Sequence, residues 1–263
     1  MKVLFQLCGL FVVVFLYSGA AIVCHAQVLE TETARTLRTG SFEIGNAFEF
    51  QYSSEGTERA VPLALEYGIT DRMEVLVEPV FGTAIVPETG RRAHGLGDLE
   101  VTTSYLLRHE NGGIPALAFA AEVKIPTAKN KLIGTGKTDY AGYLIASKRF
   151  GRLDTHANFG YTIVGQPAGT SLNNILNFAL AGQYHVNNRY EVFGEILGNS
   201  SSAPGEGGGS SGVNTVTPEA AGGELVGTLG AGTYIKSKLF LFFGVSYDNN
   251  NAVLFHPGLT LQF

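Results

Sequence analysis

Hydrophobic and polar residues alternate along most of this chain, so its dominant period is two residues. Between positions 42 and 52 the even positions are mostly aromatic or aliphatic, whereas Glu43, Glu49 and Gln51 occupy odd positions. A helix would scatter these two sets around its surface, but a strand separates them onto two faces. The alternation returns clearly in segments 61–69, 73–81, 99–107, 117–125, 155–163, 176–184, 225–235, 239–247 and 253–263, and less cleanly in 139–150 and 190–198. The pattern predicts about twelve strands of about ten residues, a length that crosses a bilayer when the strand is tilted by about 45°.

The connections between these segments alternate in length. Every second connection is short, namely 70–72, 109–114, 151–153, 185–189 and 236–238. Most of the others are longer, namely 84–97, 126–138, 166–172 and 199–222, with 53–58 and 249–251 as short exceptions. Short periplasmic turns and longer outer loops are typical of bacterial outer-membrane barrels. We therefore predict an all-β fold, an antiparallel transmembrane β-barrel over residues 40–263, with long outer loops at 84–97, 126–138 and 199–222.

The last segment, 253–263, supports the prediction of a closed membrane barrel. Val253, Phe255, Leu259, Leu261 and Phe263 share one face, so the strand needs an apolar medium outside and a paired strand beside it. A closed membrane barrel supplies both, because closure pairs the last strand with segment 42–52. A soluble β-sandwich or lipocalin-like barrel would also alternate. The apolar face persists through nearly every strand, however, and the opposite face is acidic and rich in glycine and alanine, which favours the membrane barrel.

The first residues predict export. Residues 1–26 have one early lysine, an apolar run at 4–16 and small residues before a cleavage site preceding Gln27, which is the pattern of a signal peptide. Residues 27–39 would then form a short periplasmic segment, which is too short for a large plug domain but could tuck into the lumen as a partial gate. Acylation of Cys24 is a weak alternative, because Val23 stands where a small residue is expected. Both cysteines lie inside the predicted signal peptide, so we expect no disulfide, no thiolate metal site and no cysteine nucleophile in the mature chain. No motif in the sequence indicates a cofactor, and we expect none. The net charge of −5 argues against a nucleic-acid partner.

Four short motifs resemble those of a known bacterial family. They are EYGITDR at 66–72, GLGDL at 95–99, KIPT at 124–127 and HANFGY at 156–161. Together they resemble the outer-membrane family named after the MetA pathway of phenol degradation, whose members are often described as transporters. Ala128 stands where that family usually has glycine. The resemblance covers about residues 38–263 and implies a barrel that passes small solutes, with aromatic compounds as one candidate class.

If the apolar faces contact lipid, the opposite faces line the lumen. Charges on the lipid face would cost about 2–4 kcal/mol each near the midplane, so they are expected inside. The predicted pore-lining residues are Glu43, Glu49, Glu66, Glu74, Glu78, Glu100, Arg108, Glu122, Lys124, His156, Asn158, Glu195, Glu224 and His256. An acidic wall favours cations and neutral polar solutes over anions. The same residues also suit a purely structural network of paired and hydrated charges.

The outer loops carry a second group of candidates, which are basic. They are Arg91, Arg92, Lys129, Lys131 and Lys137. Guanidinium and ammonium groups at this position suit either substrate capture or the phosphates of lipopolysaccharide.

The function we expect is passive diffusion of small solutes through an outer-membrane channel. Neither a nucleotide-binding loop nor a plug domain of the energised transporters is visible in the sequence. An outer-membrane lipid-modifying enzyme is the alternative, with His156, His256, Ser104 and Ser246 as candidates by residue type, although the chain has no G-x-S-x-G or H-E-x-x-H motif. A structural or adhesive barrel without transport is the third class. The expected partners are outer-membrane lipid, the solutes, and the assembly machinery, which would read the aromatic Phe263 that ends the last strand.

Overall fold

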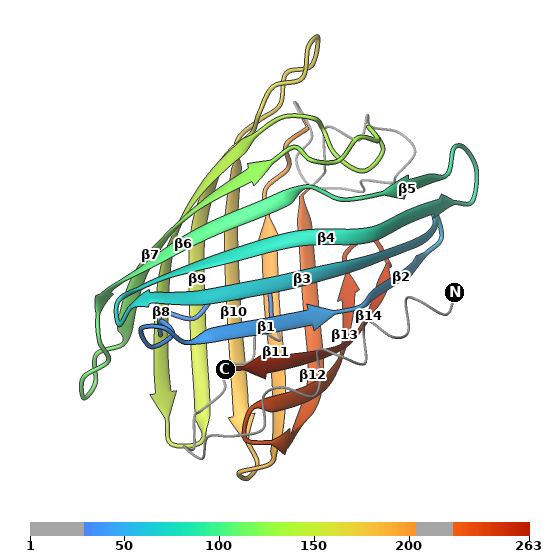
Figure 1. Ribbon diagram of the computed structural model, residues 1–263. Coiled ribbons are helices and arrows are strands. Elements are labelled where there is room, and N and C mark those ends of the chain that lie inside the picture. Colours follow the sequence, from blue (N-terminus) through green and yellow to red (C-terminus); the bar gives the residue numbers. More distant parts are fainter. Residues whose placement is uncertain (1–28, 204–222) are drawn as a thin grey trace.

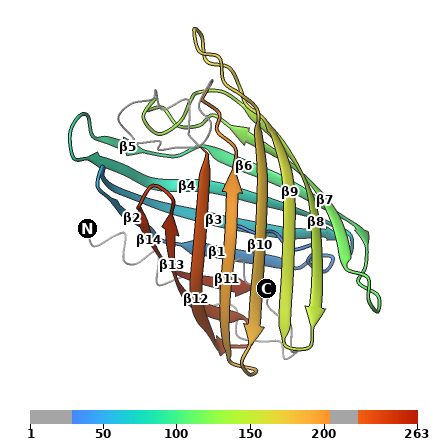
Figure 2. The same ribbon diagram turned by 180° about the vertical axis from the view of Figure 1, so that it is seen from behind.

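The computed structural model describes residues 29–203 and 223–263, which form one antiparallel sheet that closes on itself (Figures 1 and 2). The predicted signal peptide and most of loop 199–222 lie outside the described residues. Within these ranges no helix is long and apolar enough to cross a membrane. The strands are β1 (Phe42–Ala47), β2 (Glu49–Ser53), β3 (Gly56–Thr70), β4 (Met73–Pro87), β5 (Ala93–Gly95), β6 (Leu99–Arg108), β7 (Ala116–Ile125), β8 (Asp139–Phe150), β9 (Leu153–Ile163), β10 (Ile175–His185), β11 (Tyr190–Asn199), β12 (Glu224–Lys236), β13 (Leu239–Asp248) and β14 (Val253–Gln262).

Twelve strands make up the wall of this barrel, as the period of two predicted. β1 and β2 are two halves of one strand, because both pair with β3 on one side and with β14 on the other. β5 pairs only with the end of β4 that extends beyond the pairing of β4 with β6. Closure between the first and last strands is confirmed by the register Glu43↔Gln262 and by a hydrogen bond of 2.8 Å from Phe263 N to Phe42 O.

The interruption between β1 and β2 has a local cause. Phe48 lies in the gap, and the register places it beside Pro257 of β14, while Ala47 lies beside Pro62 of β3. Proline has no backbone N–H, so neither neighbour donates to the ladder at these points. Phe48 N still donates to Pro257 O over 2.9 Å, which keeps the two half-strands in one register.

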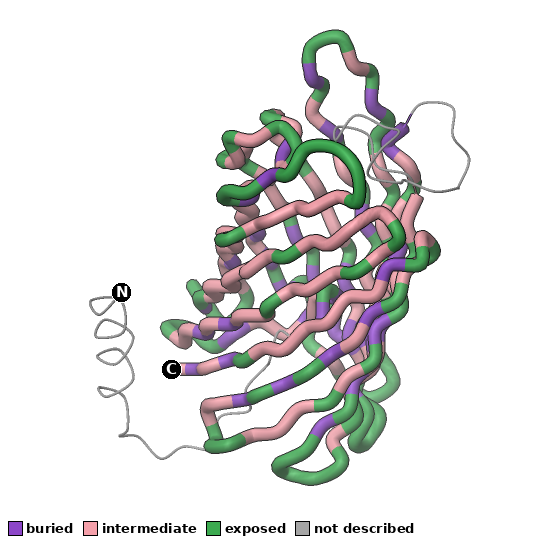
Figure 3. The backbone as a smooth tube through the Cα atoms, turned by 90° about the vertical axis from the view of Figure 1, so that its right-hand side faces the viewer, coloured by how far each residue is buried: buried purple, intermediate pink, exposed green. Residues whose placement is uncertain are grey.

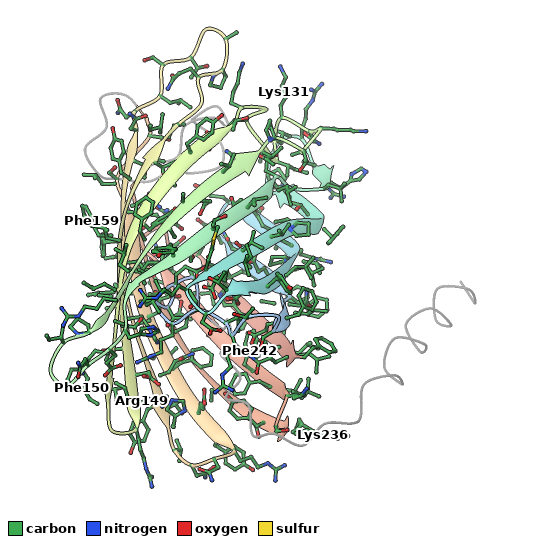
Figure 4. All side chains as sticks on the ribbon, turned by 60° about the vertical axis from the view of Figure 1, so that its left-hand side comes forward. Lys131, Arg149, Phe150, Phe159, Lys236 and Phe242 are labelled. Atoms are coloured by element: carbon green, nitrogen blue, oxygen red, sulfur yellow. The ribbon has the colours of Figure 1, made fainter. Side chains whose placement is uncertain are left out.

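The two faces of the wall have opposite character. Large apolar side chains point away from the barrel and are exposed, with Phe159 at 59% and Leu229 at 75% exposure, while small and polar residues such as Ala118 and Ser147 are buried (Figures 3 and 4). A soluble barrel would place its polar face outside, so this distribution excludes the lipocalin-like alternative. An apolar outer face over nearly every strand requires lipid around it.

Exposed tyrosines form a ring at each end of the wall. Tyr52, Tyr140, Tyr161 and Tyr247 lie near the strand ends on the side of the wall that carries the longer loops. Tyr67, Tyr105, Tyr184 and Tyr190 lie near the strand ends at the short turns. Tyrosine is enriched where a membrane meets water, because its ring is apolar and its hydroxyl is polar. The two rings therefore mark the two edges of the bilayer, and the short turns share one end with Phe42 and Phe263.

Candidate functional site: the barrel lumen

The short-turn half of the lumen is occupied by the N-terminal segment, residues 29–40. Its backbone donates to inward-facing side chains of three strands: Thr31 N to Glu195 Oε2 over 2.7 Å, Ala34 N to Ser147 Oγ over 2.8 Å, and Leu37 N to Glu74 Oε2 over 2.6 Å. Thr31 Oγ1 also donates to Glu195 Oε2 over 2.5 Å. Side chains of the wall thus satisfy the backbone N–H groups that an irregular segment leaves unpaired. The segment lies inside the barrel instead of extending into the periplasm.

Apolar side chains anchor this segment at two places. Leu29 packs in a buried cluster with Ala181, Phe193, Phe240 and Phe242, and Phe242 points inward in Figure 4. Ala34 is fully buried in a second cluster, together with Leu106, Ala116, Ala118, Ala120 and Ile145. The small alanines of β7 leave room for the segment to lie against the wall. Burial of these apolar surfaces holds the segment in place in addition to its hydrogen bonds.

Gly68 of the EYGITDR motif makes the entry of the segment into the barrel possible. A Cβ atom at this position would lie 2.2 Å from Arg38 O, so only glycine allows the two backbones to pass this closely. Gly40 N donates to Gly68 O over 2.8 Å, and Gly68 N donates to Ser41 O over 3.0 Å. The glycine of the motif is therefore required by the close backbone contact where the segment turns into β1.

Ion pairs tie the segment to the wall. Arg35 Nη2 lies 2.9 Å from Glu110 Oε2 and 2.9 Å from Asp154 Oδ1, so one guanidinium joins the β6–β7 turn to β9. Lys148 also pairs with Glu110, over 2.8 Å. Hydrogen bonds from Lys148 and Arg35 lower the pKa of Glu110 to about 2, so this carboxylate stays charged at any physiological pH. We call Arg35, Glu110 and Asp154 the ion-pair latch.

The same network continues along the short-turn end of the lumen. Arg149 binds Asp154, and His185 Nε2 lies 3.0 Å from Asp154 Oδ2 (Figure 4 shows Arg149 at this end). His185 Nδ1 lies 2.7 Å from Glu191 Oε1. Acidic and basic groups thus alternate along this network, which runs through Glu110, Arg35, Asp154, Arg149, His185 and Glu191. The charges of this network compensate one another.

The long-loop half of the lumen is different, because it contains an open cavity of about 680 Å³. Eight carboxylates line it, namely Glu30, Glu32, Glu49, Glu78, Glu100, Glu122, Glu195 and Glu224. Among the described residues that line this cavity there is no lysine and no arginine. Carboxylates gathered within low-dielectric walls create a strongly negative potential, which attracts cations and repels anions. We call this space the acidic cavity.

The structure places most predicted pore-lining residues on the inner face. Glu49, Glu78, Glu100, Glu122, Asn158, Glu195, Glu224 and His256 line the acidic cavity. Glu43, Glu74 and His156 are buried nearer the short turns, where Glu66 lies beside Glu43 in the sheet. Lys124 binds Asp139 and lies 3.9 Å from Asp98, at the outer ends of β6, β7 and β8.

Arg108 does not line the pore, so this prediction was wrong. Strict alternation from Ser104 and Leu106 puts Arg108 inside, but a β-bulge between Leu106 and Arg108 shifts the register, so that Arg108 lies opposite the outward-facing Leu117. One extra residue in a strand exchanges its two faces. The Arg108 side chain is therefore exposed at the short-turn end.

Two groups of lumen residues, the inward-facing phenylalanines and the ion-pair latch, were not among the predicted site residues. Phe240 and Phe242 face inward, opposite to Leu239, Leu241 and Phe243, as the alternation in this strand predicts, but their apolar side chains gave no sign of a role in a polar lumen. The latch residues Arg35, Glu110 and Asp154 lie in a segment, a turn and a strand end where no repeat marks them.

The candidate residues for hydrolase chemistry form two serine–histidine pairs. Ser246 Oγ lies 2.7 Å from His256 Nε2, and Ser147 Oγ lies 2.8 Å from His156 Nδ1, so Ser147 and not Ser104 is the neighbour of His156. Each serine also has a structural contact, since Ser147 Oγ accepts from Ala34 N, and Ser246 Oγ lies 2.8 Å from Thr228 Oγ1. Both pairs join neighbouring strands and lie inside the lumen. In the described part of the chain no cluster of three or more His, Cys, Asp or Glu side chains has the geometry for a metal ion.

Two outer loops form a separate basic pocket of about 940 Å³ at the long-loop end. Its walls include Arg91, Arg92, His94, Lys129 and Lys131. Lys131 extends away from the barrel at this end in Figure 4. Lys137, the fifth predicted basic residue, lies apart, with its Cβ atom against Gly165. Four of the five predicted loop residues are thus brought together, with His94 added.

The fold and the site define a transmembrane β-barrel of the outer-membrane type with a polar lumen. The chain belongs to the family described as "Putative MetA-pathway of phenol degradation", whose family model matches residues 46–221, about two thirds of the sequence. The family resemblance of the four sequence motifs is thereby confirmed. No curated protein matches the chain.

Solved structures with the same fold are named as channels and porins. The COG4313 outer membrane channel from Pseudomonas putida F1 is similar with a TM-score of 0.66 and 14% identity, over 89% of this chain and 100% of that chain. The NanC porin has a TM-score of 0.58 and 12% identity, over 83% and 98% of the two chains. The KdgM porin has a TM-score of 0.54 and 9% identity, over 83% and 99%. At these identities the likeness shows the shared barrel fold.

Proposed function

We propose that this protein is a passive channel of the outer membrane for small cationic and neutral solutes, aromatic compounds included. The observation that carries the proposal is the acidic cavity, where eight carboxylates line a space of about 680 Å³ without a lysine or arginine among the described lining residues. A wall of acidic side chains attracts mobile cations and repels anions, and this is the arrangement of a cation-selective pore. Membership in a family named after phenol degradation supports small aromatic compounds as one class of solute.

The N-terminal segment acts as the gate of this channel. It fills the short-turn half of the lumen through three backbone hydrogen bonds to the wall, two apolar anchors and the ion-pair latch. Its contacts are distributed and individually weak, so the segment can loosen without disturbing the strands. Phe193, Phe240 and Phe242 lie beside its path, and these rings offer an apolar surface to an aromatic solute that passes the gate.

Electrical recording tests the proposal directly. The protein without residues 1–26 is reconstituted in a planar bilayer, and the reversal potential is measured under a KCl gradient. We expect conductance with a reversal potential of the sign that indicates cation preference. Anion preference, or a barrel that stays silent even when residues 29–36 are removed, would contradict the channel.

The location and assembly of the barrel are part of the same proposal. Phe263 N donates to Phe42 O, and the two rings have centroids 6.1 Å apart, so the last residue lies at the closure seam on the short-turn rim. We infer that the assembly machinery reads this terminal aromatic strand and inserts the barrel into the outer membrane. Replacement Phe263→Ala should lower the amount of heat-modifiable protein in the outer-membrane fraction, with Phe263→Trp as the conservative control. Equal amounts for both variants would remove Phe263 as a signal.

A further inference from the structure

The basic pocket at the long-loop end has no role in the proposed channel, since it lies outside the lumen. Its described lining comprises Arg91, Arg92, His94, Lys129 and Lys131 together with Gly95, Leu96, Thr127, Asn130 and Leu132. No aspartate or glutamate is found among these lining residues. Four permanent positive charges therefore face one concave surface, although the protein as a whole has a net charge of −5. A cluster of positive charges on a protein whose net charge is negative indicates a negatively charged partner.

The two loops that form the basic pocket hold each other in place. Thr127 Oγ1 donates to Gly97 O over 2.9 Å, and Ala128 N donates to Asp98 Oδ1 over 2.9 Å. Gly134 fits against this junction, because a Cβ atom there would lie 2.7 Å from Asp98 Oδ2. Asp98, at the base of these loops, is thus engaged in loop structure and with Lys124. The pocket is formed before a ligand arrives, which reduces the entropy cost of binding.

A second turn inside the later loop strengthens this arrangement. Leu132 N donates to Asn130 Oδ1 over 3.0 Å, and Ile133 N donates to Asn130 O over 2.9 Å. The Ile133 side chain approaches Gly95 of the earlier loop, where a Cβ atom would lie 3.5 Å from Ile133 Cδ1. Lys129 and Lys131 therefore project from an ordered turn and face the arginines of the neighbouring loop.

The pocket also has an apolar component. Leu96 and Leu132 line it with 53% and 36% of their surface exposed. Exposed leucines contribute nothing to the capture of a small inorganic anion. They suit a ligand that carries hydrocarbon next to its negative charge, because the cations bind the charge while the leucines contact the chain.

We propose that the basic pocket binds a phosphorylated glycolipid of the outer leaflet, with its phosphates on Arg91, Arg92, Lys129 and Lys131 and its acyl chains toward Leu96 and Leu132. The orientation of the barrel favours this occupant, since longer loops face the cell exterior in barrels of this type. Phosphate oxygens accept bidentate hydrogen bonds from guanidinium and point-charge contacts from ammonium. Basic pockets at a membrane surface bind anionic head groups by the same contacts. The lipid would hold the two loops against the membrane surface.

Binding of lipid A to the purified protein without residues 1–26 tests this proposal. The bound fraction is measured by native mass spectrometry in detergent, with diphosphorylated lipid A and with the same lipid after removal of its phosphates. The test variant carries Arg91→Ala, Arg92→Ala, Lys129→Ala and Lys131→Ala. The control variant removes four cations from the opposite rim, with Arg72→Ala, Arg152→Ala, Lys236→Ala and Lys238→Ala, so the change in net charge is the same. Heat-modifiable migration shows that both variants are folded.

We expect the test variant to bind diphosphorylated lipid A at least about tenfold more weakly, a loss of about 1.4 kcal/mol, and the control variant to bind as the unchanged protein does. The lipid without phosphates should bind weakly to all three proteins. Equal binding by the test and control variants, or equal binding of the two lipids, would overturn the proposal.

A second variant separates the lipid from a free anion. Leu96→Ser with Leu132→Ser keeps every cation, so it should lose lipid A binding while inorganic phosphate binds it as it binds the unchanged protein. If this variant keeps full affinity for lipid A, the pocket captures small anions and the lipid proposal is wrong. The same conclusion follows if benzoate competes with bound inorganic phosphate and lipid A does not. None of these measurements depends on conductance, so they remain decisive if the channel itself is disproved.

Discussion

The two halves of the lumen are built from the same strands but solve the problem of buried charge in opposite ways. In the short-turn half Arg35 supplies a counter-charge to Glu110 and Asp154, and the N-terminal backbone donates to Glu74. In the long-loop half the acidic cavity has eight carboxylates and, among its described lining, no lysine or arginine. The lumen is filled where acidic and basic groups of the chain pair with each other, and it contains an open cavity where acidic side chains predominate.

Removal of the N-terminal segment should have the largest effect on the difference between the filled and the open half of the lumen. Deletion of residues 29–36 takes away Thr31, Ala34 and Arg35, and with them the hydrogen bonds and ion pairs that fill the short-turn half. We expect single-channel conductance to rise several-fold, because the acidic cavity would then continue to the periplasm. Planar-bilayer recording measures this, with heat-modifiable migration as the control for folding. An unchanged conductance would show that the segment is no barrier to ions.

Neutralisation of the acidic cavity should have the next largest effect. The combined replacements Glu78→Gln, Glu100→Gln and Glu122→Gln remove three of its eight carboxylates without changing side-chain volume. We expect the cation-to-anion permeability ratio to fall toward unity, while conductance changes little. Reversal potentials in a KCl gradient measure the ratio. Glu88→Gln, on an exposed part of an outer loop, is the matched control and should leave selectivity as it is.

Loss of one latch residue should have a smaller effect than deletion of the whole segment. Arg35→Gln leaves Glu110 with Lys148 and Asp154 with Arg149, so the wall stays compensated while the segment is released. We expect openings to become more frequent, with each opening of unchanged size. Arg35→Lys should be intermediate, because an ammonium group reaches the two carboxylates less well than a guanidinium fork. Equal opening frequencies for Arg35→Gln and for the exposed Arg38→Gln would show that the latch does not hold the gate.

The pH dependence of the latch should be the smallest effect. Hydrogen bonds to Lys148 and Arg35 lower the pKa of Glu110 from 4.5 to about 2. A carboxylate with a lowered pKa contributes its full stabilisation above its unfolded pKa and loses it as the pH falls through its folded pKa. The difference in opening frequency between the unchanged protein and Glu110→Gln should therefore persist at pH 4 and vanish toward pH 2. A difference that already fades between pH 5 and pH 4 would show that Glu110 titrates normally.

Much of the wall could be predicted because the information is local. The face of Glu100 or Glu122 follows from alternation alone, and the contact of Ser147 with His156 follows from the register of one hairpin, β8–β9. Prediction failed where a local rule was broken or silent. A bulge turned Arg108 outward, and the apolar side chains of Phe240 and Phe242 gave no sign that they take part in a polar lumen.

The contacts that hold the N-terminal segment in the lumen could not be predicted, because they join distant residues. Thr31 and Glu195 are 164 positions apart, and Ala34 and Ser147 are 113 apart. Residues 29–40 have no period that would mark them as part of the barrel. The basic pocket shows an intermediate case, since its charges were recognisable along the chain but their convergence with Leu96 and Leu132 required the folded loops.

The sequence by itself determined the barrel: the alternation of faces, the number of strands, the closure between the first and last strands, and the end that carries the long loops. These features follow from a two-residue period and from connection lengths, both of which act over a few neighbouring residues. Only the tertiary structure decided which half of the lumen is filled and which is open. Closure of the wall brings side chains from all twelve strands to one axis, and an N-terminal segment without regular structure binds wherever those side chains can satisfy its backbone and charges.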